Sequence, residues 1–478
     1  MKAIYKKYTQ LSQPLKASLW FTICSTLQKA ISFITVPVFT RLLTTDQYGL
    51  FNVYQSWLQI ITIFATLNLA AGVFNNGMIK YDDDRDRYTS AMQGLSTTVT
   101  VGLFLICLTF NGLWQTITQL PLVLLFAMFA EMLFVPAFNY WAARQRFEYR
   151  YRKLVVLTLI VSILNPIVGI LSVLSTEDKG VARIVSATLV QVCIYLVIYI
   201  HNAVKGKKFF AKQYWKFAIA FNIPLIPHYL SSIVLGQSDR IMINYFCGTG
   251  AAGVYSVAFS VAMVMNIVSQ GINSSFVPWT YQKLKKQKYK DIGNISNFIL
   301  LLVGAAIIFL VAFAPEIIKI MAPAEYYEAI WIIPAVALNT YFAFLYSLFA
   351  NIEFYYEENI FIAIASILAA LANITLNAIF IPIVGYLAAG YTSLTCYIIY
   401  SITHYIFMTK VCRKHIDGFK IYNVRFIIFF SIGLIIASFL LMFVYGHIIL
   451  RYLFVSIVLM ILYIKRNFIM EKLRSIKN

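Results

Sequence analysis

The chain has 478 residues, of which 60% are hydrophobic and only 12% are charged, whereas ordinary globular proteins are roughly 45–50% apolar. Its formal net charge of +20 is divided among gaps between apolar segments, so the sequence lacks the continuous basic face that a nucleic-acid-binding protein needs. The composition predicts an all-α polytopic membrane protein and excludes nucleic acid as a partner.

About fourteen apolar segments are long enough to span a bilayer, because a transmembrane helix needs about 20 mostly apolar residues. They cover 17–40, 49–78, 89–111, 118–142, 154–175, 182–203, 215–245, 252–277, 294–318, 329–352, 359–381, 386–409, 424–445 and 450–465. The first follows Lys2, Lys6 and Lys7 but continues to Phe39, beyond the roughly 7–15 apolar residues of a signal peptide. We therefore expect it to remain as the first transmembrane helix.

Lysine and arginine are concentrated in alternate gaps between these segments. Of the 39 such residues, 32 lie in 1–16, 79–88, 144–153, 205–216, 283–290, 410–425 and the tail from 465. Short loops rich in Lys and Arg stay on the cytoplasmic side. The pattern predicts a multi-pass protein of the inner (cytoplasmic) membrane with both termini in the cytoplasm.

A weak internal repeat suggests two related halves. The second segment opens at Gly49 and the eighth at Gly253, each with an aromatic residue close behind. If segments 1–6 and 7–12 are equivalent, they form two pseudo-symmetric six-helix lobes with a substrate site at their interface. The predicted division is an N-terminal lobe at 1–210, a C-terminal lobe at 211–412, and two additional helices with a basic cytoplasmic tail at 413–478.

The seventh segment contains Pro224 and Pro227, three residues apart. Each proline removes a helical hydrogen bond, and the freed carbonyls must be satisfied by neighbouring helices or a water-filled cavity. One interpretation is a simple kink, and the other is a broken helix that lines a transport path. Under the second interpretation, the two prolines form a gate or hinge.

Ionisable residues within the segments are candidate site residues, because a charge in lipid costs at least about 2.5–3.5 kcal/mol and normally faces the bundle interior or water. Lys29 and Glu131 form either a structural ion pair or part of a cavity. Arg240 suits a phosphate ligand because its planar guanidinium binds two oxygens at once, although it could instead extend to the membrane surface. Lys29 and Arg240 are the predicted substrate-binding cations, and Glu131, Asp239 and His228 are predicted coupling or counter-ion groups.

The sequence contains no pattern typical of an enzyme or a metal protein. The six cysteines form no CxxC pair, and no phosphate-binding GxxxxGK[ST] loop is present. The acidic run 82–86 could hold a metal in a membrane glycosyltransferase, but no other catalytic constellation accompanies it. We therefore expect neither an enzyme nor a protein with a metal or cofactor.

Two stretches resemble the signatures of Wzx-type O-antigen flippases and related polysaccharide exporters. The first is 36–51 (VPVFTRLLTTDQYGLF), and the second combines Pro224-x-x-Pro227 with 238–243 (SDRIMI) and 253–256 (GVYS). This family belongs to the multidrug/oligosaccharidyl-lipid/polysaccharide exporter superfamily. The resemblance implies two six-helix lobes around a V-shaped, cation-lined central cavity.

The resemblance also implies that an undecaprenyl-pyrophosphate-linked oligosaccharide, an O-antigen or capsule repeat unit, moves from the cytoplasmic to the periplasmic leaflet by alternating access. Coupling to H⁺ or Na⁺, contact with membrane lipids, and association with polysaccharide polymerase or assembly proteins are further implications. A multidrug antiporter and a peptidoglycan lipid-precursor flippase of the same superfamily are alternatives. A membrane polysaccharide polymerase or ligase is a third, but such enzymes carry a large periplasmic loop, and the gap at 315–328 is too short to provide one.

Overall fold

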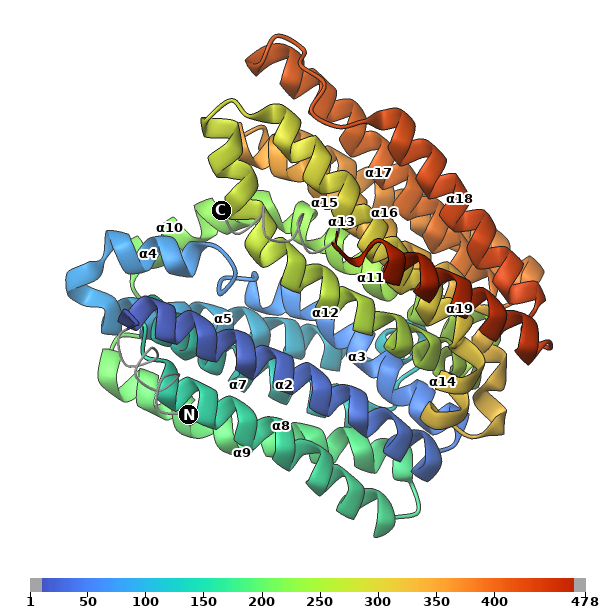
Figure 1. The fold of residues 1–478 in the computed structure, drawn as a ribbon. Coiled ribbons are helices and arrows are strands. Elements are labelled where there is room, and N and C mark those ends of the chain that lie inside the picture. Colours follow the sequence, from blue (N-terminus) through green and yellow to red (C-terminus); the bar gives the residue numbers. More distant parts are fainter. Residues whose placement is uncertain (1–10, 468–478) are drawn as a thin grey trace, which may run out of the picture. The chain divides into compact units, whose positions relative to one another are not determined.

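The computed structural model describes residues 11–467. The basic residues Lys2, Lys6 and Lys7 and the tail beyond 467 lie outside that range. Every regular element among the described residues is a helix, which confirms the all-α prediction (Figure 1). The chain forms two compact units, Met1–Ala252 and Gly253–Asn478. The structure thus groups 211–252 with the N-terminal helices, while the division at 210 and 412 remains a prediction.

The first unit contains the helices α2 to α11. They are α2 (Gln13–Leu42), α3 (Thr45–Thr66), α4 (Val73–Lys80), η1 (Asp82–Asp84), α5 (Arg85–Thr109), α6 (Asn111–Thr118), α7 (Leu122–Phe147), α8 (Tyr151–Leu174), α9 (Lys179–Gly206), α10 (Lys212–Asn222), η2 (Ile223–Leu225) and α11 (Ile226–Cys247). Helix α9 is central, because α3, α5, α7 and α8 all pack against it. Helix α2 packs on α8, and α11 packs on α3.

The second unit contains most of α12 and the helices that follow. They are α12 (Thr249–Lys285), α13 (Tyr289–Ala312), α14 (Ala314–Met321), η3 (Ala324–Trp331), α15 (Ile333–Tyr355), α16 (Asn359–Val384), α17 (Ala388–His415), α18 (Val424–Phe443) and α19 (Ile448–Ile464). Helix α15 is the centre of this unit, since α13, α16, α17 and α18 contact it. Its membrane-length window is 83% buried.

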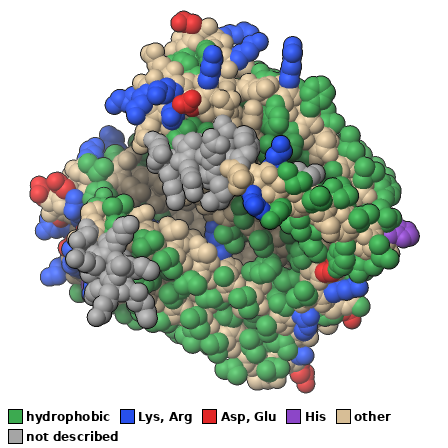
Figure 2. All heavy atoms as spheres, viewed as in Figure 1, with side chains coloured by type: hydrophobic (Ala, Val, Ile, Leu, Met, Phe, Trp, Pro, Cys, Tyr) green, Lys and Arg blue, Asp and Glu red, His purple; other side chains and the backbone are tan. Residues whose placement is uncertain are grey.

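The predicted membrane spans correspond to helices in the structure. Among the described residues, eleven helices are long and apolar enough to cross a membrane by length and composition. The three other predicted spans correspond to α3 and α17, which are long but richer in polar residues, and to α19, which is shorter. Large hydrophobic side chains such as Leu171, Val197 and Phe429 are exposed along these helices. In the face drawn in Figure 2, hydrophobic side chains cover much of the helix flanks, as expected for a surface in contact with lipid tails.

Two predicted spans are interrupted. The segment predicted as one helix over 49–78 ends as α3 at Thr66 and resumes as the short α4 at Val73. Leu67 and Asn68 between them adopt left-handed backbone conformations, with φ of 50° and 48°, which end an α-helix. The seventh span changes from α10 to a 3₁₀ turn at 223–225 and then to α11, with a proline in the first turn of both later pieces.

Candidate functional site

A polar cavity of about 310 Å³ lies within the first unit, at the level where α3 is interrupted. It is bounded by α3, α7, α9 and α11 and by the turn that follows α3. Its polar lining consists of Gln55, Gln59, Thr62, Thr66, Asn68, Glu131, Asn139, Tyr140 and Gln191. Amides and hydroxyls at this density inside apolar helices provide both donors and acceptors for a hydroxyl-rich molecule or for water.

Glu131 is the ionisable residue in the lining of this cavity, and its side chain is almost fully buried, with 3% of the residue exposed. The Tyr54 hydroxyl of α3 donates to Glu131 Oε1 at 3.2 Å, and the Thr188 hydroxyl of α9 donates to the same oxygen at 2.5 Å. These two hydrogen bonds connect Glu131 to α3 and α9. A carboxyl group held by two hydroxyls and facing a polar cavity can bind and release a proton.

The two interrupted spans meet beside this cavity. Asn222, the last residue of α10, is completely buried, and its Nδ2 donates to the Leu67 carbonyl at 2.7 Å. That carbonyl has lost its helical partner because α3 ends there, so the asparagine satisfies it within the helical bundle. Gly72 allows the close approach, since a Cβ at that position would lie 3.0 Å from the Tyr229 hydroxyl of α11. Each helix break therefore stabilises the other.

Arg240 lies on α11 and is connected to the cavity by amide side chains. Only 8% of the residue is exposed, and Nη1 donates to Gln237 Oε1 at 2.7 Å. Gln237 Oε1 also accepts from Ser56 at 3.1 Å, and its Nε2 donates to Gln59 Oε1 at 3.1 Å. Because Gln59 lines the cavity, a continuous polar path leads from the guanidinium to the cavity wall.

The other predicted site residues lie on α2, on α11 and in the 3₁₀ turn that precedes α11. Lys29 is half-buried on α2, and Asp239 is buried on α11 with 4% exposed. His228 is half-buried in the first turn of α11, 6.0 Å from the neighbouring Tyr229 ring. Pro224 lies in the 3₁₀ turn and Pro227 in the first turn of α11. Among the predicted residues, Glu131 lines the polar cavity.

Arg183 is a deeply placed cation that is not among the site residues predicted from the sequence. In the structure it lies near the start of α9 and is 8% exposed. Its guanidinium lies 4.3 Å from the Phe39 ring centre and 4.8 Å from that of Phe51, and Nη1 donates to Asn165 Oδ1 at 3.1 Å. The sequence offered one indication of this burial, because Arg183 is the second residue of the predicted span 182–203.

The second unit contains a buried His–Glu pair and a partly buried Arg–Glu pair that sequence reasoning also missed. His404 Nδ1 of α17 lies 3.0 Å from both carboxylate oxygens of Glu353 on α15, and neither side chain is exposed. Arg451 of α19 contacts both oxygens of Glu316 at 2.7 Å. Glu353 stands one residue beyond the predicted span 329–352, and Arg451 is the second residue of 450–465, so both lie at the edge of a predicted span.

Comparison with known proteins places this arrangement in a family. The Haemophilus influenzae protein named "Lsg locus putative protein 1" is 23% identical over 393 residues, which cover 77% of this chain and 94% of that protein. A second Haemophilus influenzae relative, an uncharacterized membrane protein, is 24% identical over 328 residues, 65% of this chain and 74% of that protein.

Solved structures with a similar fold belong to transporters. The lipid II flippase MurJ in an inward closed conformation has a TM-score of 0.73 at 13% identity, covering 94% of this chain and all of that one. An inward-facing multidrug resistance MATE transporter of the MOP superfamily has a TM-score of 0.64 at 14% identity, covering 84% and 99%. The chain therefore has the fold of the MOP-superfamily transporters.

The strongest assignment comes from the family model described as polysaccharide biosynthesis protein, which matches residues 15–284. This range contains the polar cavity, both interrupted spans and all seven site residues predicted from the sequence. Because the match covers more than half of the 478 residues, the chain belongs to the polysaccharide biosynthesis protein family.

Proposed function

We propose that this protein is a flippase that moves an undecaprenyl-pyrophosphate-linked oligosaccharide, an O-antigen or capsule repeat unit, from the cytoplasmic to the periplasmic leaflet. It works as a secondary transporter by alternating access and not as an enzyme. The observation that carries the proposal is the family match over 15–284, because the matched range includes a polar, membrane-embedded cavity. The MOP-superfamily fold supports a transport role by analogy.

The chemistry of such a substrate explains the kinds of residue in the first unit. A pyrophosphate carries about two negative charges, and an uncompensated buried ion costs several kcal/mol even after relaxation. Cations within the helical bundle offset that cost, and Arg240 and Lys29 are proposed to contact the phosphate oxygens in turn. A few separated cations lower the barrier to translocation without holding the anion so tightly that release stalls.

The lipid part of the substrate needs an apolar surface. An apolar groove of about 640 Å³ lies in the second unit between α13, α18 and α19, and its walls include Leu301, Ile308, Phe429 and Leu434. Because lipid tails are as apolar as these walls, a polyprenyl chain would be held there by van der Waals packing and not by a hydrophobic gain over water. The groove is thus compatible with a lipid-linked substrate.

Ion coupling is proposed to use carboxyl or imidazole groups in the first unit. Glu131 is the leading candidate because it faces the polar cavity through two hydroxyl partners, and Asp239 and His228 are further candidates on α11. H⁺ suits a carboxyl group that accepts hydroxyl donors, whereas Na⁺ would need several oxygen ligands around it. Glu131→Gln keeps the shape and removes proton exchange, so we expect transport that no longer responds to the proton gradient.

The central experiment measures surface polysaccharide in cells that lack the chromosomal gene and express each variant. Arg240→Ala and Lys29→Ala should each lower surface polysaccharide at unchanged protein level, and the lipid-linked unit should accumulate facing the cytoplasm. Arg240→Lys should retain part of the function because it keeps the charge and loses only the planar fork. Arg413→Ala, which removes an exposed cation at the end of α17, is the matched control. Wild-type surface polysaccharide in both Ala variants would refute the assignment.

The membrane orientation is tested independently of the substrate. We propose that both termini face the cytoplasm, as the distribution of Lys and Arg predicts. In a cysteine-free background, single cysteines at the exposed positions Gln115 and Glu177 should react with an impermeant thiol reagent in intact cells, whereas one at Lys286 should not. Labelling at Lys286 in sealed cells would reverse the orientation and therefore the proposed direction of transport. A polysaccharide polymerase or other assembly protein is the proposed partner, to be sought by cross-linking in the same cells.

A further inference from the structure

A second and larger pocket opens at the basic end of the first unit. It encloses about 680 Å³ and lies where the C-terminal ends of α7 and α9 meet the N-terminal ends of α2, α5 and α8. Its lining includes six cations, namely Lys16, Arg144, Arg150, Arg152, Lys153 and Lys205. Its residues differ entirely from those lining the Glu131 cavity, so the transport proposal does not account for it.

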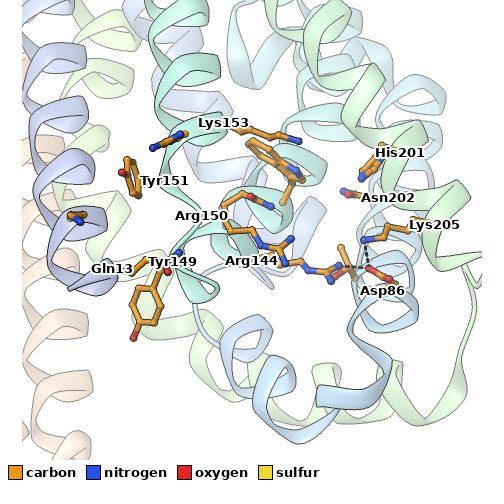
Figure 3. Close-up of a pocket in the computed structure, with 15 residues that line it drawn as sticks. Gln13, Asp86, Arg144, Tyr149, Arg150, Tyr151, Lys153, His201, Asn202 and Lys205 are labelled. Atoms are coloured by element: carbon orange, nitrogen blue, oxygen red, sulfur yellow. Dashed lines mark hydrogen bonds and ion pairs between the residues drawn. The ribbon is translucent and has the colours of Figure 1, made fainter. Parts of the chain in front are cut away.

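Tight backbone packing holds the walls of this pocket in place. Gly206 ends α9 against α5, where an added Cβ would lie 2.3 Å from the Asp86 carbonyl oxygen. This contact brings Lys205 Nζ within 3.3 Å of the Asp86 carboxylate, which also accepts from Arg144. Figure 3 shows Asp86 and Lys205 on one side of the pocket, with Arg144 extending toward them from the last turn of α7.

The turn between α7 and α8 directs side chains into the pocket through an unusual residue. Tyr149 has a φ of 55°, a conformation that usually falls to glycine after a helix end. Hydrogen bonds from Arg150 N to the Gln145 carbonyl at 2.8 Å and from Tyr149 N to the Arg146 carbonyl at 3.2 Å close the turn. In this left-handed conformation a tyrosine is less stable than a glycine. The Tyr149 ring lines the pocket, which is a role beyond closing the turn.

The charge of the pocket is only partly neutralised by protein groups. Glu148 pairs with Arg144 at 2.9 Å and with Arg150 at 3.1 Å, and Asp86 pairs with Arg144 and Lys205. No such pair involves Arg152 or Lys153, which are exposed and have no acidic partner among residues 11–467. The two carboxylates thus pair with Arg144, Arg150 and Lys205, and the positive charge of Arg152 and Lys153 would attract an anion.

Aromatic side chains around the pocket indicate that it lies at the level of lipid headgroups. Trp141, Tyr149 and Tyr151 line it, and the Tyr151 ring stacks on Trp20 of α2 with 6.4 Å between ring centres. Trp and Tyr are enriched at membrane–water interfaces because their rings are apolar and their polar atoms can face water. Clusters of Lys and Arg at that level bind anionic headgroups.

We propose that this pocket binds the phosphate-bearing headgroup of an anionic lipid. Arg152 and Lys153 provide the charge that protein carboxylates leave uncompensated, while Arg144 and Lys205 are oriented by Asp86 at the inner wall. The same phosphate chemistry could be presented by a membrane phospholipid, by a polyprenyl phosphate or by free pyrophosphate. The inference concerns this site alone and does not depend on the flippase proposal.

The test measures lipid binding to the purified full chain by native mass spectrometry, with phosphatidylglycerol as the probe and phosphatidylcholine as the neutral reference. Arg152→Glu combined with Lys153→Glu should weaken phosphatidylglycerol binding at least about tenfold, given the contribution of each cation near an anionic surface. The matched control combines Lys286→Glu with Lys288→Glu, which reverses two exposed cations in a different basic loop and should change binding less than about threefold. Equal binding by the first variant and wild type, or an equal loss in both variants, would overturn the proposal.

Two further arms identify the source of the phosphate. Undecaprenyl phosphate and inorganic pyrophosphate are each added as competitors against phosphatidylglycerol. Displacement by undecaprenyl phosphate alone assigns the site to a lipid-borne phosphate, and displacement by both assigns it to phosphate as such. If a competitor displaces phosphatidylglycerol from the Arg152/Lys153 variant at the same midpoint concentration as from wild type, the anion binds elsewhere. That result overturns the proposal. The thermal midpoint of each variant, measured alongside, separates loss of binding from loss of folding.

Discussion

The buried pair of His404 and Glu353 provides the sharpest test of how the second unit is held together. Nδ1 lies 3.0 Å from both carboxylate oxygens, both side chains are fully buried, and the imidazole also stacks on Tyr346 with 5.3 Å between ring centres. His404→Ala would leave the carboxylate buried without its partner. Breaking a buried pair in this way costs about 3–5 kcal/mol, and loss of the ring contact adds about 0.5–1.5 kcal/mol.

The expected change in thermal stability follows from the size of the unit. For 150–250 residues, 1 kcal/mol shifts the unfolding midpoint by about 2–4 °C, so His404→Ala should lower it by roughly 7–25 °C in detergent solution. Glu353→Gln should cost less, about 1 kcal/mol, because the amide can still hydrogen-bond to the ring. Replacing both residues by leucine should recover part of the loss, since apolar residues can substitute for a buried ion pair.

The assay is a thermal scan of purified wild type, His404→Ala, Glu353→Gln and the variant that combines these two changes, read as a double-mutant cycle, with the double leucine variant measured alongside. The reasoning requires the double leucine variant to be more stable than His404→Ala. It would be refuted if His404→Ala lowered the midpoint by less than about 3 °C, or if the two changes were additive. Either result would mean that water reaches the pair or that the surrounding helices rearrange around the cavity.

Three further predictions concern pH, packing and movement. Hydrogen bonds from the arginine of α19 hold the pKa of Glu316 below its ordinary value. The resulting stability is present above the unfolded pKa of about 4.3 and is lost as the pH falls through the lower folded value. The difference in thermal midpoint between wild type and Glu316→Gln should therefore shrink between about pH 6 and pH 3. Gly206→Ala should destabilise the first unit by about 1–3 kcal/mol because the added Cβ meets α5, whereas Gly102→Ala, where nothing lies within 4 Å, should be neutral or stabilising in the same thermal scan. Replacing Pro224 and Pro227 together by alanine should leave an inserted protein with slower transport of the lipid-linked unit; an unchanged rate would limit the prolines to a packing role.

The sequence alone determined the class of this protein and the order of its helices. Membrane spans are recognisable because lipid requires about 20 apolar residues for each crossing and forces every backbone group into helical hydrogen bonds. The two prolines likewise marked the place where α10 gives way to α11, since proline cannot continue the helical bonding pattern. These signals lie within short stretches of the sequence, so they can be recognised without knowledge of the tertiary structure.

Which polar residues contact each other depends on the packing of helices that are far apart in the sequence. Nothing near Leu67 in the sequence indicates that α3 ends there, because its freed carbonyl is satisfied by Asn222, 155 positions away. Glu131 likewise receives its hydrogen bonds from Tyr54 and Thr188, 77 and 57 positions away. Such partners are set by the packing of α3, α7, α9 and α10, and helix periodicity says only which face is polar, not which helix covers it.

Helix packing also explains why several charged residues at the edges of the predicted spans are buried. Arg183, Glu353 and Arg451 all stand at or near the end of an apolar segment, where hydropathy cannot distinguish a side chain in water from one packed beneath a neighbouring helix. Their burial depends on rings and opposite charges supplied by other helices, as with Phe39 beside Arg183. Hydropathy measures the preference of a residue for lipid, whereas these positions are decided by the protein surface that meets them.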